Sequence, residues 1–148
     1  IIHRDLELDV LHLEGGGAAG GMGAGLYAFC GAKLRPGIEI VTDALHLADI
    51  VADADLVITG EGRIDSQTVH GKVPVGVARV AKRYNLPVIG IAGSLTSDVG
   101  VVHQHGLDAV FSVIYSICTL DEALENAAEN VRMTARNVAA VLKIGRLL

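Results

Sequence analysis

Short apolar runs alternate with polar and amphipathic stretches along most of the chain. The runs at 55–59 and 87–92 are almost wholly apolar, and each leads into a glycine-containing turn, which is typical of buried parallel strands. The run at 108–113 has the same character, and the run at 38–42 predicts a fourth strand. Strands separated by helical segments predict an α/β fold.

Helical periodicity fills the intervals between these runs. Apolar spacing predicts helices at 45–51 and 75–84 and a short helical piece near 98–105. A long final helix is expected to begin at the capping box formed by residues 119–122 (TLDE). The predicted architecture is a Rossmann-like, three-layer α/β fold: a mainly parallel sheet with helices on both faces.

The two strongest strand candidates are expected to be neighbours at the centre of this sheet. Residues 56–58 and 88–91 carry almost no polar side chains, as expected for strands covered by helices on both faces. The Arg35-Pro36-Gly37 sequence is a candidate hinge. It places a possible lobe boundary near 32–37, between a glycine-rich segment (1–36) and an α/β lobe (37–148).

The composition of the chain argues against several classes of function. The chain has 148 residues, of which 51% are hydrophobic, 20% charged and 3% aromatic, and its net charge is -5. Low aromatic content and negative charge argue against a nucleic-acid partner. The apolar runs are too short to cross a membrane, and a secretory leader is not recognisable at the N-terminus. The two cysteines, Cys30 and Cys118, are too few for a disulfide framework, so we expect a reduced, cytoplasmic chain.

A glycine-dense segment, GGGAAGGMGAG, occupies residues 15–25. Gly17, Gly21 and Gly25 would share one helical face, where another backbone could approach closely. The segment also satisfies the dinucleotide pattern G-x-G-x-x-G, although the stretch before it (8–13) is a poor strand. A site that holds a phosphate on backbone N–H groups is a simpler interpretation, because it requires only the loop and the start of a helix. The candidate N–H donors are Gly15, Gly17, Gly20 and Gly21.

The richest polar stretch in the chain lies between residues 60 and 72. Because it follows a buried strand, it should lie at the carboxyl edge of the sheet, where α/β proteins bind ligands. Phosphoryl transfer needs cations, a carboxylate and backbone donors, and this stretch contains all three. A solvated surface loop is the alternative. The candidate residues are Gly60, Glu61, Gly62, Arg63, Asp65, Ser66, Gln67, Thr68 and Lys72.

Three segments together resemble the C-terminal part of the bacterial glycerate kinases of the glycerate 2-kinase type. They are GGGAAGGMGAGLYAF, KLRPGIEIVTDAL and ADLVITGEGRIDSQTVHGKVPVGVARVAKRY. The likeness covers nearly the whole chain, and TGEGRIDSQT is its most specific part. One departure is GGGAAGG, where the family usually has GAGAAGG. The family's N-terminal DS-x-K and ADGGEG segments do not occur in the chain.

The resemblance implies a two-lobed α/β kinase that transfers a phosphoryl group from ATP, with Mg²⁺, to D-glycerate and forms 2-phosphoglycerate. Residues 1–148 would be its C-terminal portion and would need the N-terminal remainder as a partner. The isolated chain is therefore expected to have negligible kinase activity.

This interpretation suggests a role for each candidate residue. Arg63 and Lys72 would neutralise phosphate or the glycerate carboxylate, while Asp65 and Glu61 would orient the acceptor hydroxyl or bind Mg²⁺. The remaining polar and glycine residues would form hydrogen bonds. Two other classes stay open: a non-catalytic α/β module that binds a phosphorylated metabolite, and a dinucleotide-dependent oxidoreductase.

Overall fold

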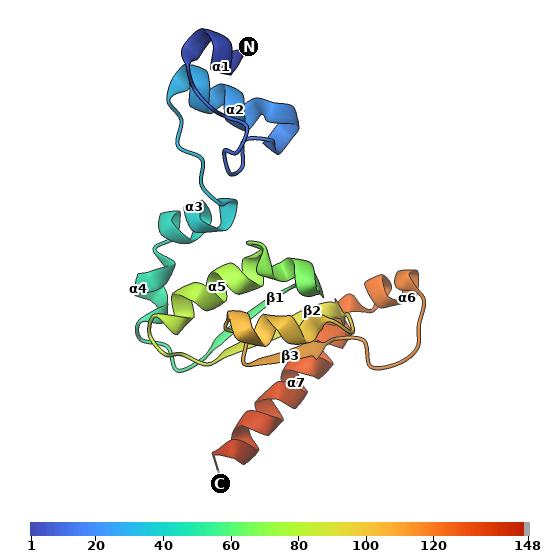
Figure 1. Cartoon of the computed structure of the whole chain (residues 1–148). Helices are drawn as coiled ribbons and strands as arrows, with labels where there is room; N and C mark the ends of the chain where they lie inside the picture. Colours follow the sequence, from blue (N-terminus) through green and yellow to red (C-terminus); the bar gives the residue numbers. More distant parts are fainter. Residues whose placement is uncertain (147–148) are drawn as a thin grey trace. The chain divides into compact units, whose positions relative to one another are not determined.

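The computed structural model describes residues 1–146 (Figure 1). The chain forms two compact units, of which the first is Ile1–Val41 and the second begins at Thr42. The second unit contains the sheet.

The first unit is helical. It contains α1 (Ile2–Leu6), α2 (Ala18–Cys30) and most of α3 (Gly37–Ala44). The strand predicted at 38–42 is wrong, because these residues form the body of α3. The backbone N–H groups of Glu39 and Ile40 donate to the carbonyl of Pro36 and so begin a helix. An apolar run of four or five residues does not by itself distinguish a strand from a helix.

The glycine-dense segment is not a regular helix along its whole length. Ala19, Gly20 and Gly21 have φ values of 50°, 70° and 91°, so three successive residues are left-handed. The expected small-residue face is also wrong: a Cβ atom on Gly17, Gly21 or Gly25 would meet no heavy atom within 4 Å. The close approach is instead at Gly23, where a Cβ would lie 2.5 Å from the carbonyl oxygen of Gly15.

The second unit is built on a three-stranded parallel sheet. Its strands are β1 (Val57–Ile64), β2 (Val88–Leu95) and β3 (Ala109–Ser112), in the spatial order β1-β2-β3. The predicted parallel pairing and adjacency are confirmed. The prediction that both strong runs are central is wrong, because β1 lies at an edge of the described sheet and Ile58 is 54% exposed.

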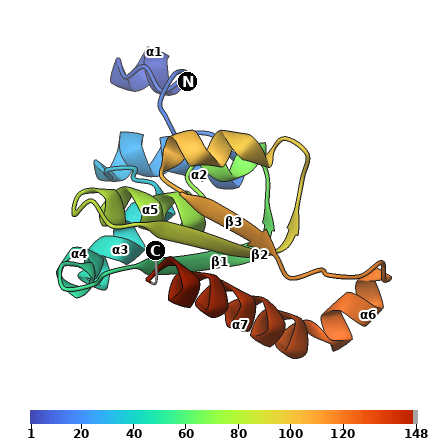
Figure 2. The same cartoon turned by 90° about the horizontal axis from the view of Figure 1, so that it is seen from below.

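Helical segments cover the two faces of this sheet, as Figures 1 and 2 show. The helix α5 (Val73–Lys82) and the 3₁₀ helix η2 (Val99–His105) lie on one face of the sheet. The helix α7 (Ala127–Gly145) lies on the opposite side. α4 (Leu47–Val51) packs against α5. The core lies on the α5 face, where Val75 and Ala78 of α5 and Val88 of β2 are completely buried. The predicted three-layer α/β architecture is confirmed.

The C-terminal helical region begins as predicted but is interrupted. The side chain of Thr119 accepts a hydrogen bond from the N–H of Glu122, and the carboxylate of Glu122 accepts one from the N–H of Thr119. This capping box starts α6 (Leu120–Glu125), and Asn126 separates α6 from α7. The side-chain amide of Asn126 donates to the carbonyl of Glu122 and so closes the end of α6.

Candidate functional site

A polar cleft lies where β1 and β2 end. It has a volume of about 670 Å³ and contains residues that follow β1 as well as residues that follow β2. Ligand sites of parallel α/β sheets lie beyond the carboxyl ends of the strands. Its lining residues are Arg63, Asp65, Ser66, Gln67, Lys72, Thr96, Ser97 and Asp98.

Asp65 organises the β1 side of the cleft. It precedes the 3₁₀ helix η1 (Ser66–Val69), and its Oδ1 accepts a hydrogen bond of 3.0 Å from the N–H of Gln67. The N–H of Asp65 donates in return to the hydroxyl of Thr68 over 3.2 Å. This reciprocal pair is a capping box, and it fixes the carboxylate of Asp65 at the start of the loop.

Two cations flank the carboxylate of Asp65. Lys72 Nζ lies 3.2 Å from its Oδ1, and Arg63 Nε lies 3.6 Å from its Oδ2. Burial of the carboxylate raises the pKa of Asp65, but the hydrogen bond and charge of Lys72, the N–H of Gln67 and the charge of Arg63 outweigh it, so this pKa lies below its ordinary value. Asp65 is therefore an ionised acceptor, and the two cations are held at the mouth of the cleft.

Glu61 is placed differently from Asp65. Its Oε1 accepts a 2.7 Å hydrogen bond from the hydroxyl of Thr68, which is completely buried. Glu61 lines a second, apolar groove between the sheet and the α6–α7 region rather than the polar cleft. The two carboxylates that the sequence treats as equivalent therefore have different surroundings.

The glycines of β1 and β2 allow the two strands to approach closely near this site. A Cβ atom on Gly60 would lie 2.3 Å from the carbonyl oxygen of Ile91, and one on Gly93 would lie 2.4 Å from that of Gly62. Gly62 itself has open space at its Cβ position. Gly60 thus has a structural role that the sequence did not reveal.

Sequence reasoning missed the β2 side of the cleft. Thr96, Ser97 and Asp98 follow β2 directly. The hydroxyl of Thr96 donates to Oδ1 of Asp98. The sequence does contain a signal for these residues. The polar sequence Thr96-Ser97-Asp98 comes after an apolar run that was predicted to pair in parallel with β1.

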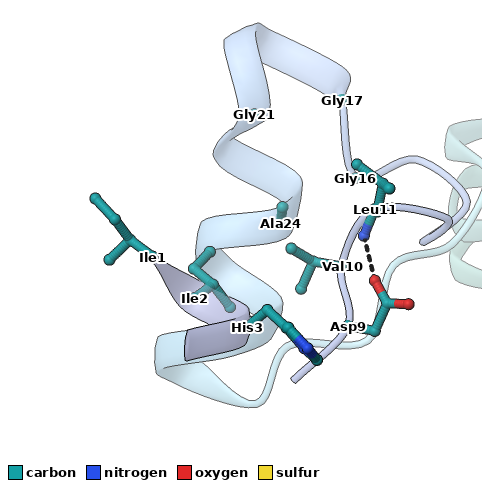
Figure 3. A pocket seen from close by; sticks show the side chains of 10 residues that line it. All are labelled: Ile1, Ile2, His3, Asp9, Val10, Leu11, Gly16, Gly17, Gly21 and Ala24. Carbon is teal, nitrogen blue, oxygen red and sulfur yellow. Dashed lines mark hydrogen bonds between the residues drawn. The ribbon is translucent and has the colours of Figure 1, made fainter. Parts of the chain in front are cut away.

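The predicted glycine donors belong to the first unit. There the segment borders a pocket of about 760 Å³ whose lining includes Gly17 and Gly21 (Figure 3). The N–H of Gly21 donates to the carbonyl of Gly17 over 3.2 Å. Residues 8–13, which a dinucleotide fold would need as a strand, form no strand.

The predicted magnesium ligands do not form a metal centre. Residues 1–146 contain no group of three or more His, Cys, Asp or Glu side chains arranged to hold a metal ion. The cations beside Asp65 also oppose the approach of a further positive ion. Because Mg²⁺ usually binds one or two carboxylates together with substrate phosphates, magnesium binding by Asp65 or Glu61 stays a prediction, and we assign no chemical step to it. Over the same residues, no helix is long and apolar enough to cross a bilayer.

Fold and cleft together define an α/β protein with a charged cleft beyond the carboxyl ends of parallel strands, where proteins of this class bind their ligands. A sequence profile of the glycerate kinase family matches residues 1–143. The chain belongs to the glycerate kinase family.

Individual relatives agree with this assignment. The chain is 65% identical over 145 residues to glycerate 2-kinase of Escherichia coli K12, and 55% identical over 135 residues to glycerate kinase of Bacillus subtilis 168. These matches cover 98% and 91% of the chain but 38% and 35% of the relatives. A crystal structure assigned to glycerate kinase 2 of Salmonella typhimurium LT2 is 77% identical, with a TM-score of 0.75, and the match covers 99% of the chain and 37% of that structure.

Proposed function

We propose that the full-length protein containing this chain is an ATP-dependent glycerate 2-kinase, and that the polar cleft is part of its active site. Family membership supports the reaction class. The observation that carries the assignment of the cleft is the position of Asp65 between Lys72 and Arg63 at the carboxyl ends of two parallel strands. This arrangement offers positive charge for phosphate and glycerate carboxylate oxygens, together with one ionised acceptor.

In the proposed reaction, a hydroxyl oxygen of D-glycerate forms a bond to the γ-phosphorus of ATP. The bond between that phosphorus and the β–γ bridging oxygen breaks, ADP leaves with the electron pair, and the hydroxyl proton passes to solvent. Positioning and charge stabilisation supply most of the catalysis in reactions of this kind. Transfer to the 2-hydroxyl gives 2-phosphoglycerate.

We assign the orientation of the acceptor hydroxyl to Asp65 rather than to Glu61. Asp65 lines the polar cleft, and its low pKa keeps it an acceptor at neutral pH. Glu61 lines the apolar groove instead, where it accepts from the buried hydroxyl of Thr68. Glu61 is therefore assigned to holding η1, and through it the position of Asp65.

The cations and hydroxyls around Asp65 complete the proposed site. Lys72 and Arg63 would neutralise the transferred phosphoryl group and the glycerate carboxylate, because charge-assisted hydrogen bonds to anions are strong. Ser66 and Gln67 line the same cleft and would donate hydrogen bonds to substrate oxygens. Thr68 acts through Glu61 and Asp65.

In the full-length protein, further groups would complete the site. Gly15, Gly17 and Gly20 would supply backbone N–H donors to phosphate oxygens. Magnesium would enter bound to ATP, as part of the substrate. The N-terminal remainder would complete the site, since the matched relatives are more than twice as long as this chain. A cytoplasmic location stays a prediction.

The experiment is a product analysis with the full-length protein, ATP, Mg²⁺ and D-glycerate. We expect glycerate-dependent ADP formation and a ³¹P NMR signal of 2-phosphoglycerate. Formation of 3-phosphoglycerate would contradict the regiochemistry. A protein that binds glycerate or a phosphorylated acid without turnover would contradict the kinase assignment and favour a binding module.

A further inference from the structure

The two sides of the polar cleft are joined where β1 and β2 end. Ile64 of β1 is the register partner of Leu95 of β2. The residues that follow them, Asp65 and Thr96, therefore leave the sheet at the same edge, and both line the cleft. The N–H of Thr96 donates to the carbonyl of Ile64 over 3.4 Å. The start of the loop after β2 is thus bound to the residue that precedes Asp65.

Asp98 lines the cleft from the β2 side. It is exposed and directly precedes η2, a position where an Asp side chain usually caps the helix. Over the described residues 1–146, however, the Asp98 side chain makes no capping hydrogen bond to η2. Its Oδ1 accepts from the hydroxyl of Thr96 instead. Since an ionised carboxylate has room for about four hydrogen bonds, Asp98 keeps acceptor sites for a ligand in the cleft.

The charges around Asp98 differ from those around Asp65. Asp65 lies between Lys72 and Arg63. Within the part of the chain that the structure describes, no lysine or arginine forms an ion pair with Asp98. A carboxylate without a neighbouring cation repels phosphate and carboxylate groups, whereas it accepts a hydrogen bond from a neutral hydroxyl. The anionic groups of the substrates therefore belong beside Lys72 and Arg63, and Asp98 suits a hydroxyl.

D-glycerate contains a hydroxyl that the proposed function leaves without a protein partner. Its carboxylate and the transferred phosphoryl group are assigned to the cations, and its 2-hydroxyl is assigned to Asp65. The 3-hydroxyl is on the neighbouring carbon atom. We infer that Asp98 is a specificity residue that accepts a hydrogen bond from this 3-hydroxyl, and that Thr96 positions the Asp98 carboxylate. The inference rests on the proposed kinase function, and it gives the site a means to select a 2,3-dihydroxy acid.

The expected size of this selection follows from the exposure of Asp98. A buried site that hydrogen-bonds a substrate hydroxyl can reject the analogue without that hydroxyl by about 10⁴-fold or more. At an exposed carboxylate, water replaces part of the lost hydrogen bond. The selection should therefore be close to the value of one hydrogen bond to a charged group, about 10-fold.

The kinetic test compares D-glycerate with D-lactate, which has the same 2-hydroxyl and lacks the 3-hydroxyl. In the full-length enzyme, Asp98→Ala should lower kcat/KM for D-glycerate about 10-fold and leave that for D-lactate unchanged. Asp53→Ala is the control, since Asp53 is exposed but lies outside the cleft lining, and it should keep the wild-type preference. An equal fall for both substrates, as expected if Asp98 held Mg²⁺ or the ribose of ATP, would overturn the inference.

Binding measurements give the same comparison without turnover of D-lactate. Titration calorimetry in the presence of a non-hydrolysable ATP analogue should show a Kd for D-glycerate about 10-fold higher in Asp98→Ala than in wild type. The Kd for D-lactate should be the same in both proteins. Equal effects on the two ligands, or no effect on either, would contradict a contact with the 3-hydroxyl.

Thr96 provides a second variant that leaves the Asp98 carboxylate in place. Thr96→Val removes the hydroxyl that donates to Asp98 and should reduce the preference for D-glycerate in part, whereas Thr96→Ser should keep it. Equal preferences in Thr96→Val and wild type would remove Thr96 from the inference. A wild-type enzyme without glycerate-dependent turnover would overturn the proposed function, whereas an active Asp98→Ala enzyme with the wild-type preference would overturn this inference alone.

Discussion

Lys72 Nζ and Asp65 Oδ1 lie 3.2 Å apart at the carboxyl end of β1. The two residues are separated by η1, whose capping box fixes Asp65, and Lys72 directly precedes α5. Arg63 Nε approaches the other carboxylate oxygen at 3.6 Å. Both oxygens of Asp65 therefore face a cation.

Removal of Arg63 should affect substrate binding first. Its side chain is 64% exposed, so its ion pair with Asp65 contributes little to stability. In Arg63→Ala, an anionic substrate loses a charge-assisted contact, and we expect KM for glycerate or ATP to rise about 10-fold. Steady-state kinetics of the full-length enzyme measure this effect. Arg63→Lys should retain part of the binding, and wild-type KM values for both substrates in Arg63→Ala would contradict the assignment.

Thr68 should be important for folding as well as for the site. Its buried hydroxyl donates to Glu61 and accepts from the N–H of Asp65. In Thr68→Val both partners lose a hydrogen bond in a site of similar shape, which should lower the free energy of unfolding by about 1–3 kcal/mol. Urea denaturation measures the loss. Thr68→Ser keeps the hydroxyl and should be closer to wild type; equal losses in the two variants would argue against the hydrogen bonds.

Two glycines of the same strand should respond differently to alanine. In Gly60→Ala the new Cβ would lie 2.3 Å from the carbonyl oxygen of Ile91, so β1 and β2 must separate. In Gly62→Ala the Cβ meets no heavy atom within 4 Å. We expect Gly60→Ala to destabilise the protein by more than about 2 kcal/mol and Gly62→Ala to be close to neutral. Similar melting temperatures for the two variants would contradict the strand register.

Asp108 should make stability depend on pH. Its Oδ2 accepts from Lys82 Nζ and from the N–H of Val88, each over 2.6 Å, and the hydrogen bond from Lys82 is the main reason that the pKa of Asp108 is lowered. A carboxyl whose pKa is lower in the folded state stabilises that state above its unfolded pKa of about 3.9, and this contribution disappears as the pH falls through the folded pKa.

Asp108→Ala leaves the buried N–H of Val88 without this acceptor, so we expect a loss of about 1–3 kcal/mol at pH 7. The ion pair adds little to that figure, since the Asp108 side chain is 50% exposed. The difference between variant and wild type should shrink below about pH 4. Thermal unfolding from pH 7 to pH 3 tests this, and a difference that grows with acidity would contradict it.

The parallel sheet was predictable because its strands contain short apolar runs, a pattern that depends on burial. The glycine-containing turns expected after the first two runs are wrong, because Gly60 and Gly62 lie inside β1 and Gly93 lies inside β2. The edge position of β1 was not predictable, since an apolar run does not say how many neighbours a strand has. The run at 38–42 failed for a related reason: four or five apolar residues suit a helix as well as a strand. The edge position of β1 and the helix at 38–42 depend on contacts with the rest of the fold and not on the local sequence.

The β1 half of the cleft was predictable because one continuous polar stretch, residues 60–72, follows an apolar run predicted as a strand. Thr96 and Asp98 were missed because they belong to a polar stretch of only three residues after β2, which is a weaker signal than the long polar stretch at 60–72. The different surroundings of Glu61 and Asp65 depend on the buried hydroxyl of Thr68. Side-chain burial of this kind is not visible in a sequence pattern.

The most direct measurement is the kcat of Asp65→Asn in the full-length enzyme, with ATP, Mg²⁺ and D-glycerate at saturation. The substitution keeps the shape of the side chain and removes the charge that faces Lys72 and Arg63. If Asp65 orients the acceptor hydroxyl, kcat should fall by about 10²-fold or more while the melting temperature changes little. A wild-type kcat in a folded Asp65→Asn enzyme would contradict the placement of the active site in this cleft.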